Sequence, residues 1–239
     1  MKITIGHLFP DLLNLYGDRG NIAALTKRME ARKIETEVKT YGIDDEINFA
    51  DLDIVFIGGG SDREQLLVCK RLLKIKSDIT AYVENGGCLA AVCGGYQLLG
   101  HYYQLENEKI EGLKILDIYT VQGSPRLIGN IILESEYAGG TVVGFENHGG
   151  RTVINSHKPL GKVLYGYGND GKSGYEGVVY KNVVATYLHG PLRPKNPKLA
   201  DKIIKNAVTK KDKSFVLGDI DSALENTAHN YIVDRFLKK

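Results

Sequence analysis

The chain has 239 residues, of which 43% are hydrophobic and 25% are charged, as in ordinary soluble globular proteins. Thirty-one basic against 29 acidic residues leave a net charge of +2, which excludes the concentrated basic field of nucleic-acid binding proteins. No stretch has the ~20 apolar residues of a membrane helix, so we expect no membrane insertion. Three cysteines are too few for a secreted disulfide framework. We expect a cytoplasmic protein with a single domain over residues 1–239.

The first 40 residues alternate between strand and helix patterns. Residues 2–8 and 35–40 predict strands. A helix is expected between them, with Asp11 as its N-cap. Its apolar residues at helical spacing are Leu12, Leu15, Ile22 and Leu25.

The next segment continues this alternation. A short apolar run at 53–57 predicts a buried parallel strand that ends in the glycine loop 58–60. One helix is expected over 63–83, and the following strand, 87–92, runs directly through Cys93 into another helix. Strand and helix in alternation predict a doubly wound α/β sheet.

Beyond Ile110 the pattern changes to short β-rich runs separated by glycine turns. The predicted strands are 113–121, 129–135, 141–145, 161–165, 175–180 and 182–188. We expect them to add antiparallel strands to the same sheet. Helices are expected near 197–208 and 222–237, the second capped by Asp221 or Ser222. The apolar residues of the last helix, expected to face inward, are Leu224, Ile232 and Phe236.

The run GGCLAAVCGGYQLLG places Cys93 where a buried strand turns sharply into a helix, which is the geometry of a nucleophile elbow. Amides at the start of that helix stabilise negative charge on the sulfur. The backbone N–H of Gly94 and a second donor from Gly60 are expected to form an oxyanion hole. Cys69 and Cys88 are interpreted as small buried hydrophobic residues.

A cysteine nucleophile needs a base that is near in space but distant in sequence. His189 ranks first, because it follows the apolar strand 183–188, and active sites gather at strand ends in open α/β sheets. His148, in FENHGG, ranks second, and His7, at the end of the first strand, ranks third. The other histidines, expected to be solvated, are His101, His157 and His229.

Residues 93–97, CGGYQ, resemble the C-x-G-x-Q elbow of class I glutamine amidotransferases. GFENHGGRT at 144–152 is similar to the signature of the cobyric acid synthase (CobB/CobQ) branch. NLYGDRGNI at 14–22 and PRLIGN at 125–130 resemble the GatD-type glutaminase subunits of lipid II isoglutaminyl synthase. The resemblance implies a flavodoxin-like class I glutaminase fold: α/β, with a mostly parallel central sheet, added antiparallel strands and helices on both faces.

The resemblance also implies hydrolysis of L-glutamine to glutamate and ammonia. A Mur-ligase-like, MurT-type synthetase subunit would use the ammonia and ATP to amidate the α-carboxylate of D-glutamate in the lipid II stem peptide. Cys93 would form a γ-glutamyl thioester and His189 would transfer the proton. Gln97, Gly59 and Gly60 would line the glutamine pocket.

Arg126 stands where the subunit family uses a substrate residue, and its guanidinium matches a carboxylate in a bidentate manner. The resemblance therefore implies that Arg126 binds the carboxylate of glutamine or helps to pass substrate. No cofactor or metal is expected in this subunit, while ATP and Mg are expected in the partner.

The sequence departs from the family at the third catalytic position. Most class I enzymes have a glutamate two residues after the histidine, whereas Pro191 follows His189 at that spacing. No acid lies between Glu176 and Asp201. We therefore expect a Cys-His dyad, with Glu146 as one candidate for orienting the imidazole.

Other functions remain open from the sequence. The acceptor of the ammonia is chosen by the partner, so a cobyric-acid-type pathway is one alternative. A stand-alone γ-glutamyl cysteine hydrolase would share the elbow and the histidine, and a flavodoxin-like binding module would carry a structural Cys93. The glycine triplet 58–60 lacks the lysine and Ser/Thr of a P-loop, so we do not expect nucleotide binding.

Overall fold

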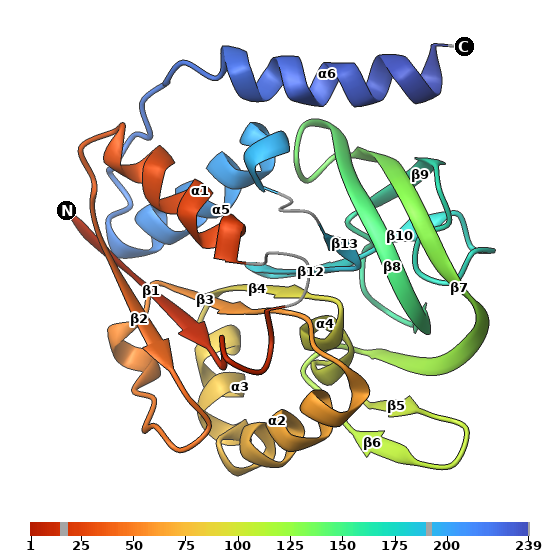
Figure 1. Cartoon of the computed structure of the whole chain (residues 1–239). Coiled ribbons are helices and arrows are strands. Elements are labelled where there is room, and N and C mark those ends of the chain that lie inside the picture. The colour runs from red at the N-terminus through yellow and green to blue at the C-terminus, as the bar shows by residue number, and fades with distance from the viewer. Residues whose placement is uncertain (15–18, 190–192, 239) are drawn as a thin grey trace.

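The computed structural model describes residues 1–14, 19–189 and 193–238, and a six-stranded sheet lies at its centre (Figure 1). The strand order is β11-β12-β4-β3-β1-β2, in which β11 is antiparallel to β12 and the other pairs are parallel. The bounds are β1 Lys2–Leu8, β2 Glu35–Tyr41, β3 Ile54–Ile57, β4 Cys88–Val92, β11 Val178–Tyr180 and β12 Val183–Thr186. The predicted doubly wound α/β sheet is confirmed.

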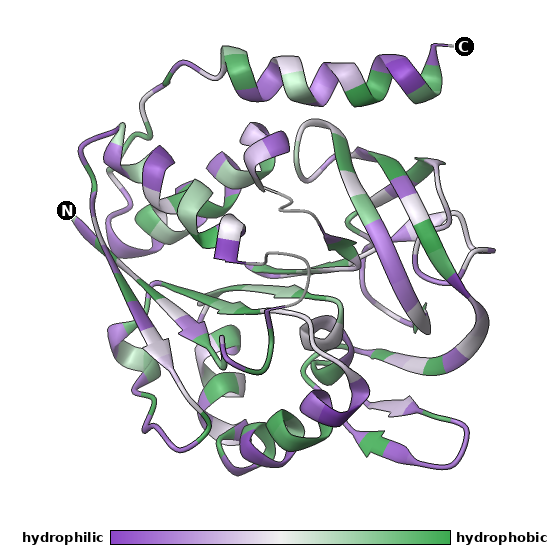
Figure 2. Ribbon diagram, in the orientation of Figure 1, coloured by the Kyte–Doolittle hydropathy of each residue, from purple (hydrophilic) through white to green (hydrophobic). Residues whose placement is uncertain are grey.

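Helices cover both faces of this sheet. The helices α1 (Arg19–Glu30) and α5 (Pro197–Lys211) lie on one face, and α2 (Asp62–Lys74) and α3 (Lys76–Glu84) lie on the other (Figure 1). The inner strands β3, β4 and β12 are hydrophobic along their length (Figure 2) and every residue in them is buried. Burial on both faces explains why these strands lack the alternation of half-exposed strands.

The first helix begins at Arg19 and not after Asp11, so that prediction was wrong. Phe9 has a positive φ of 56°, and its carbonyl accepts hydrogen bonds from the N–H groups of the third and fourth residues after it. This turn buries Leu13 and ends before a helix can form. The predicted helical position Leu15 lies outside the described residues.

The helix expected over 63–83 is divided in two at Ile75, which leaves helical geometry at φ −110° and ψ 19°. The Ile75 N–H bonds to the Leu72 carbonyl, three residues back, so the last turn of α2 tightens before α3 starts. No glycine or proline marks this break, which is why the apolar spacing alone predicted one helix.

Most strands of the second half form a separate seven-stranded sheet, which corrects the expectation that they extend the first. The long strands β7 (Ile118–Ser135) and β8 (Gly140–Ile154) pair as an antiparallel hairpin. Its other strands are β5 Tyr102–Gln104, β6 Lys109–Glu111, β9 Gly161–Tyr165, β10 Tyr175–Glu176 and β13 Leu188–His189. The run predicted at 129–135 lies within β7, as do residues 118–121 of the run predicted at 113–121, and the pairing is irregular between Gln122 and Leu127.

The last helix, α6, spans Ala223–Leu237, close to the predicted 222–237. Asp221 accepts the Ala223 N–H through its side chain, whereas Ser222 makes no capping hydrogen bond. The described residues also include 3-10 turns at Phe49–Asp51 and Arg193–Lys195. In the part of the chain that the structure describes, no helix combines the length and apolar character needed to cross a membrane.

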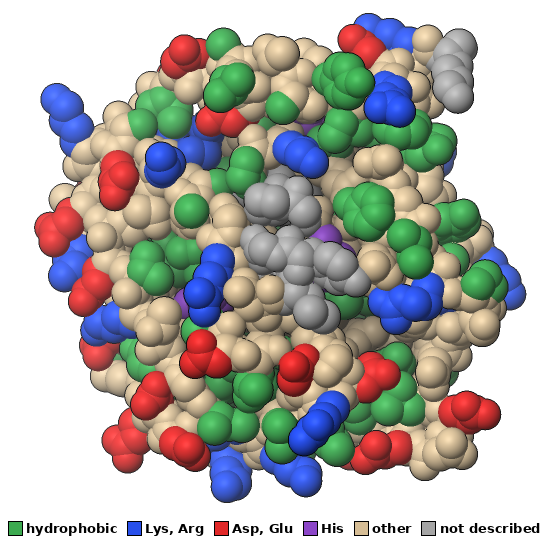
Figure 3. Space-filling view, viewed as in Figure 1, with side chains coloured by type: hydrophobic (Ala, Val, Ile, Leu, Met, Phe, Trp, Pro, Cys, Tyr) green, Lys and Arg blue, Asp and Glu red, His purple; other side chains and the backbone are tan. Residues whose placement is uncertain are grey.

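The inward orientation expected for α6 was wrong for Leu224, whereas Ile232 and Phe236 are half-buried, and no residue of the helix is fully buried. Leu224 is 82% exposed and Tyr231 is 64% exposed. His229 bonds to Thr141 at 2.7 Å, and the Phe236 ring lies 4.7 Å from another aromatic ring. Hydrophobic side chains therefore appear along the α6 edge of the molecule in Figure 3. Amphipathic spacing does not say whether the rest of the chain covers an apolar face.

Candidate active site

Cys93 lies between β4 and the short helix α4 (Gly94–Leu98), with φ 51° and ψ −105°. This backbone conformation is strained for any residue with a Cβ, as at nucleophile elbows. The Gly95 N–H bonds to the Gly58 carbonyl at 3.1 Å. A Cβ on Gly95 would lie 2.8 Å from the Ile57 carbonyl oxygen, so only glycine fits this close approach. The sequence CGG therefore makes the predicted sharp turn for a local steric reason.

The histidine that ranks first from the sequence lies beside this turn. The Cys93 N–H bonds to the carbonyl of Thr186, the last residue of β12, at 2.8 Å. The chain then leaves the first sheet at Tyr187 and joins the second as β13. A Cβ built on Gly59 would lie 3.0 Å from the Cys93 Cβ and 3.3 Å from the His189 Cε1. Cys93, His189 and the Gly59 backbone thus converge on one point.

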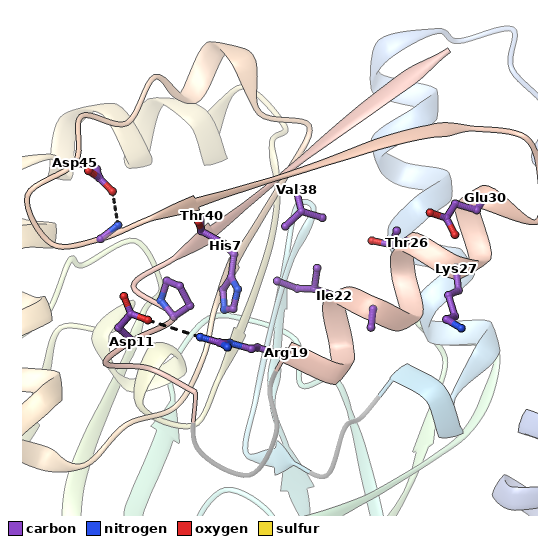
Figure 4. A pocket seen from close by; sticks show the side chains of 13 residues that line it. His7, Asp11, Arg19, Ile22, Thr26, Lys27, Glu30, Val38, Thr40 and Asp45 are labelled. Atoms are coloured by element: carbon purple, nitrogen blue, oxygen red, sulfur yellow. Dashed lines mark hydrogen bonds and ion pairs between the residues drawn. The ribbon is translucent and has the colours of Figure 1, made fainter.

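His7, the third-ranked base, lies elsewhere. In the register of the parallel strands it is level with Phe56 on β3 and therefore with Ala90 on β4, two strands away from the elbow. It lines a pocket of about 710 Å³ between α1 and the β1–β2 edge (Figure 4). The Arg19 guanidinium and the Asp11 carboxylate, 3.6 Å apart, also line this pocket, which does not include Cys93.

His148, the second-ranked base, is a buried residue of the second sheet. Its ring stacks on Tyr187 with centroids 3.7 Å apart and planes 5° from parallel. Its Nδ1 donates to the Gly150 carbonyl at 2.8 Å. The ring is thus held against the segment where the chain crosses between the sheets.

Glu146, considered as an orienting acid, is not placed to orient His189. Leu188 pairs with Glu146, while His189 pairs with Phe145. Side chains of paired residues share a face and neighbours along a strand alternate, so Glu146 and His189 point to opposite faces. The Glu146 carboxylate instead accepts the backbone N–H groups of residues 167–168 at 2.7 and 2.9 Å.

A second buried carboxyl, that of Glu176, holds the crossover segment. It accepts the Tyr187 N–H at 2.7 Å and the Thr186 hydroxyl at 2.8 Å. Burial raises the pKa of Glu176 to about 8, those two hydrogen bonds oppose the rise, and the nearby Glu146 carboxyl adds to it. The expected departure at Pro191 lies outside the described residues.

The glycines predicted for the oxyanion hole flank a buried glutamine that the sequence did not single out. Gln65 donates to the Gly60 carbonyl at 3.1 Å, and a Cβ on Gly94 would lie 2.8 Å from its side-chain carbon. A Cβ on Gly60 would point at Leu13, 2.5 Å away, so this glycine packs on the N-terminal turn. Gly59 is the loop residue whose hypothetical Cβ would lie nearest Cys93.

Gln97, predicted to line the glutamine pocket, is buried between α4 and the second sheet. Its Nε2 donates to the Tyr187 hydroxyl at 3.1 Å, and that hydroxyl is hydrogen-bonded to Thr152 at 2.6 Å. The Gln97 side chain therefore joins the elbow helix to the crossover segment.

Arg126 lies on the exposed side of β7, where Asn147 of β8 holds its guanidinium. The Arg126 Nε donates to the Asn147 Oδ1 at 3.1 Å, and Nη2 donates to the Asn147 carbonyl at 3.0 Å. A planar guanidinium held on two of its nitrogens is pre-oriented for a carboxylate.

Electrostatic effects connect Arg126 with the elbow. Burial raises the pKa of Asp62 and the Arg126 charge opposes that rise. Burial also raises the pKa of Tyr103 to about 12, Asp62 and Cys93 add to it, and Arg126 and Arg151 oppose it. Two arginines and Cys93 therefore lie close enough to Tyr103 to affect its pKa.

Sequence reasoning missed four residues around this site: Gln65, Tyr187, Asn147 and Arg151. Two of them had a signal, since Asn147 and Arg151 lie in the quoted motif GFENHGGRT. Tyr187 and Gln65 had none, because their roles depend on which strands and helices meet. Among the residues that the structure describes, no three His, Cys, Asp or Glu side chains gather in a group that would hold a metal ion.

A known family model matches most of the chain. The CobB/CobQ-like glutamine amidotransferase domain matches residues 4–197. The chain is 45% identical over 235 residues to the lipid II isoglutaminyl synthase (glutamine-hydrolyzing) subunit GatD of Staphylococcus aureus (strain N315), covering 98% of this chain and 96% of the relative. It is 28% identical to the cobyric acid synthase of Listeria innocua, covering 83% of this chain and 40% of that protein.

Solved structures share the fold at low sequence identity. PurLQS from Thermotoga maritima has a TM-score of 0.63 at 18% identity, covering 89% of this chain and 100% of that one. The glutaminase domain of Trypanosoma brucei CTPS with bound acivicin has a TM-score of 0.54 at 11% identity, covering 90% and 96%. The matched domain spans most of the chain, and the chain belongs to the CobB/CobQ-like glutamine amidotransferase family.

Proposed function

We propose that this chain is a glutaminase subunit in which Cys93 is the nucleophile and His189 the acid and base. The observation that carries the proposal is the convergence of Cys93, His189 and Gly59 at the end of β4, with Cys93 in a strained backbone conformation. A strained elbow keeps the sulfur in front of the helix and next to the imidazole.

The reaction follows from these positions. The Cys93 thiolate attacks the side-chain amide carbon of glutamine, and negative charge moves onto the amide oxygen, where the Gly94 and glycine-loop N–H groups are its proposed donors. The C–N bond breaks as His189 donates a proton to the leaving ammonia. A water molecule then attacks the thioester, His189 takes its proton, and glutamate leaves as the thiolate is restored.

Binding of the substrate is assigned to the mouth of the site. Arg126, pre-oriented by Asn147, pairs with the α-carboxylate of glutamine. Gln97 and the Gly59–Gly60 loop line the remaining part of the pocket, and Gln97 also supports it through Tyr187. This subunit needs no cofactor of its own for thioester chemistry.

The acceptor is proposed from the relatives. The chain matches 96% of the length of the Staphylococcus aureus subunit but only 40% of the cobyric acid synthase. We therefore propose that the ammonia passes to a separate, ATP- and Mg-dependent Mur-ligase-like subunit of the MurT type, which amidates D-glutamate of the lipid II stem peptide. We expect the reaction in the cytoplasm, where that partner finds ATP.

The test is covalent labelling with 6-diazo-5-oxo-norleucine, a reactive glutamine analogue, followed by mass spectrometry. Wild type, Cys93→Ala and a matched Cys88→Ala control are incubated alone and with the ligase subunit, with and without excess glutamine. We expect one adduct on Cys93 that glutamine suppresses, and the same adduct in the control.

Absence of an adduct on the folded wild type in both the presence and the absence of the partner would contradict the proposal and favour a binding module with a structural Cys93. A labelled chain that hydrolyses γ-glutamyl compounds as fast without a partner would instead identify a stand-alone hydrolase.

A further inference from the structure

The position of His189 relative to Cys93 depends on how the chain passes from one sheet to the other. The two residues are joined through the crossover segment, residues 186–189. Thr186 is hydrogen-bonded to the Cys93 N–H at one end of it, and His189 pairs with Phe145 at the other. The conformation of these four residues therefore sets the distance between sulfur and imidazole.

One buried side chain binds the middle of this segment. The Glu176 carboxyl, 0% exposed, takes the Tyr187 N–H on Oε1 and the Thr186 hydroxyl on Oε2. The Thr186 hydroxyl in turn accepts the Leu188 N–H at 3.1 Å. Glu176 thus serves two successive backbone N–H groups, one directly and one through a hydroxyl, at the point where the chain leaves one sheet for the other.

These N–H groups need such a partner. A chain that passes between two sheets cannot use either ladder at the crossing, and a buried N–H without an acceptor destabilises the fold. Burying a carboxyl is itself costly. At Glu176 this cost is offset by the hydrogen bonds that the carboxyl makes to the backbone and side chain of residues 186–188, directly and through the Thr186 hydroxyl.

We infer that Glu176 is a positioning residue that sets His189 against Cys93 through the backbone of residues 186–188. This assignment rests on the proposed function. Glu176 acts through the chain and not by contact with substrate, so we expect its loss to slow the chemical step while leaving substrate binding intact. A misplacement of about 1 Å in such a pair lowers the rate about a hundredfold.

Labelling by 6-diazo-5-oxo-norleucine separates the two effects, because its maximal rate reports the chemistry and its half-saturating concentration reports binding. We compare wild type, Glu176→Ala, Glu176→Gln and Thr186→Val under the conditions that label wild type. Ser135→Ala is the matched control, since Ser135 also clamps a buried turn, through the Leu160 carbonyl and the Ala138 N–H.

For Glu176→Ala we expect the maximal rate to fall about 10- to 100-fold with the half-saturating concentration within about twofold. Glu176→Gln, which keeps an acceptor for Tyr187 and a polar contact with Thr186, restores the rate to within about threefold. Thr186→Val, nearly the same size as threonine, lowers the rate without opening a cavity. The effects of Glu176→Ala and Thr186→Val combine less than additively, because both break one chain of hydrogen bonds.

Rates are normalised to folded protein by thermal unfolding and near-ultraviolet circular dichroism. Ser135→Ala is expected to lower stability and leave the normalised rate unchanged. Full-rate labelling of folded Glu176→Ala and Thr186→Val would overturn the inference. Glu176 would then stabilise the fold without positioning His189. If wild type itself is not labelled, the result contradicts the proposed function and therefore also the role of Glu176 that depends on it.

Discussion

At the scale of the residue, the guanidinium of Arg126 is the group that we propose binds the carboxylate of the substrate. Asn147 holds it on two nitrogens, and it acts on the same buried tyrosine as Cys93. A charge-assisted bidentate contact contributes about 1.5–3 kcal/mol. Arg126→Ala is expected to raise KM for glutamine about 10- to 100-fold with little change in kcat, and Arg126→Lys to give an intermediate KM.

Steady-state glutaminase assays with the partner present check this prediction. Arg235→Ala serves as a control, because Arg235 is an exposed arginine on α6. A fall in kcat at unchanged KM would show that Arg126 acts on the transition state and does not bind the ground-state carboxylate.

The raised pKa of Glu176 predicts how the free energy of unfolding depends on pH. Its folded-state pKa is raised from 4.5 to about 8, so between these values the folded chain binds a proton that the unfolded chain has lost. The stabilisation that the protonated Glu176 carboxyl gives to the folded chain is therefore complete below about pH 4.5 and is lost as pH rises to about 8. The loss is on the order of a few kcal/mol. Glu176→Gln is expected to remove this slope.

Melting temperatures of wild type and Glu176→Gln between about pH 5 and pH 9 test the sign. As pH rises, the melting temperature of wild type should fall relative to that of Glu176→Gln. Parallel curves would mean that the carboxyl titrates alike in the folded and unfolded chains.

At the scale of the element, the elbow depends on the close approach of α4 to the end of β3. A Cβ at Gly95 would lie 2.8 Å from one backbone oxygen and 2.9 Å from the next, and backbone cannot move aside as a side chain can. Gly95→Ala is expected to cost about 1–3 kcal/mol and to misplace Cys93. Gly129→Ala is the matched control, since no atom lies within 4 Å of a Cβ there.

Urea unfolding measures the stability of both variants, and labelling of Cys93 measures the elbow. We expect Gly95→Ala to lose labelling and stability together and Gly129→Ala to keep both. Equal free energies of unfolding of the two variants would mean that β3 and α4 move apart to accommodate the added Cβ without loss of stability.

At the scale of the whole molecule, two sheets meet at the site while α6 lies outside both. None of the α6 residues is fully buried, and the contacts of the helix include hydrogen bonds at His229 and Glu225 and the Phe236 ring beside Tyr165. Deleting residues 219–239 is therefore expected to lower the melting temperature by less than about 5 °C. Calorimetry and Cys93 labelling of the truncated chain check this, and loss of cooperative unfolding would show that α6 belongs to the core.

The sequence by itself determined the local features of this protein. The apolar run 53–57 with its glycines, the passage of the chain through Cys93 and the bounds of α6 follow from backbone sterics and hydrophobic periodicity, which act over a few residues. The family was predicted by resemblance, from CGGYQ at the elbow together with GFENHGGRT at 144–152.

Only the tertiary structure decided which segments share a site. The second sheet, the crossover at Tyr187, the opposite faces of Glu146 and His189, and the exposed apolar side of α6 all depend on pairings between residues far apart in the chain. The roles assigned to Cys93, His189 and Arg126 stay predictions, although the structure brings Cys93 and His189 together. Strand alternation predicts which face of a strand a residue occupies but not which residue it contacts there. That contact depends on the packing free energy of the whole chain.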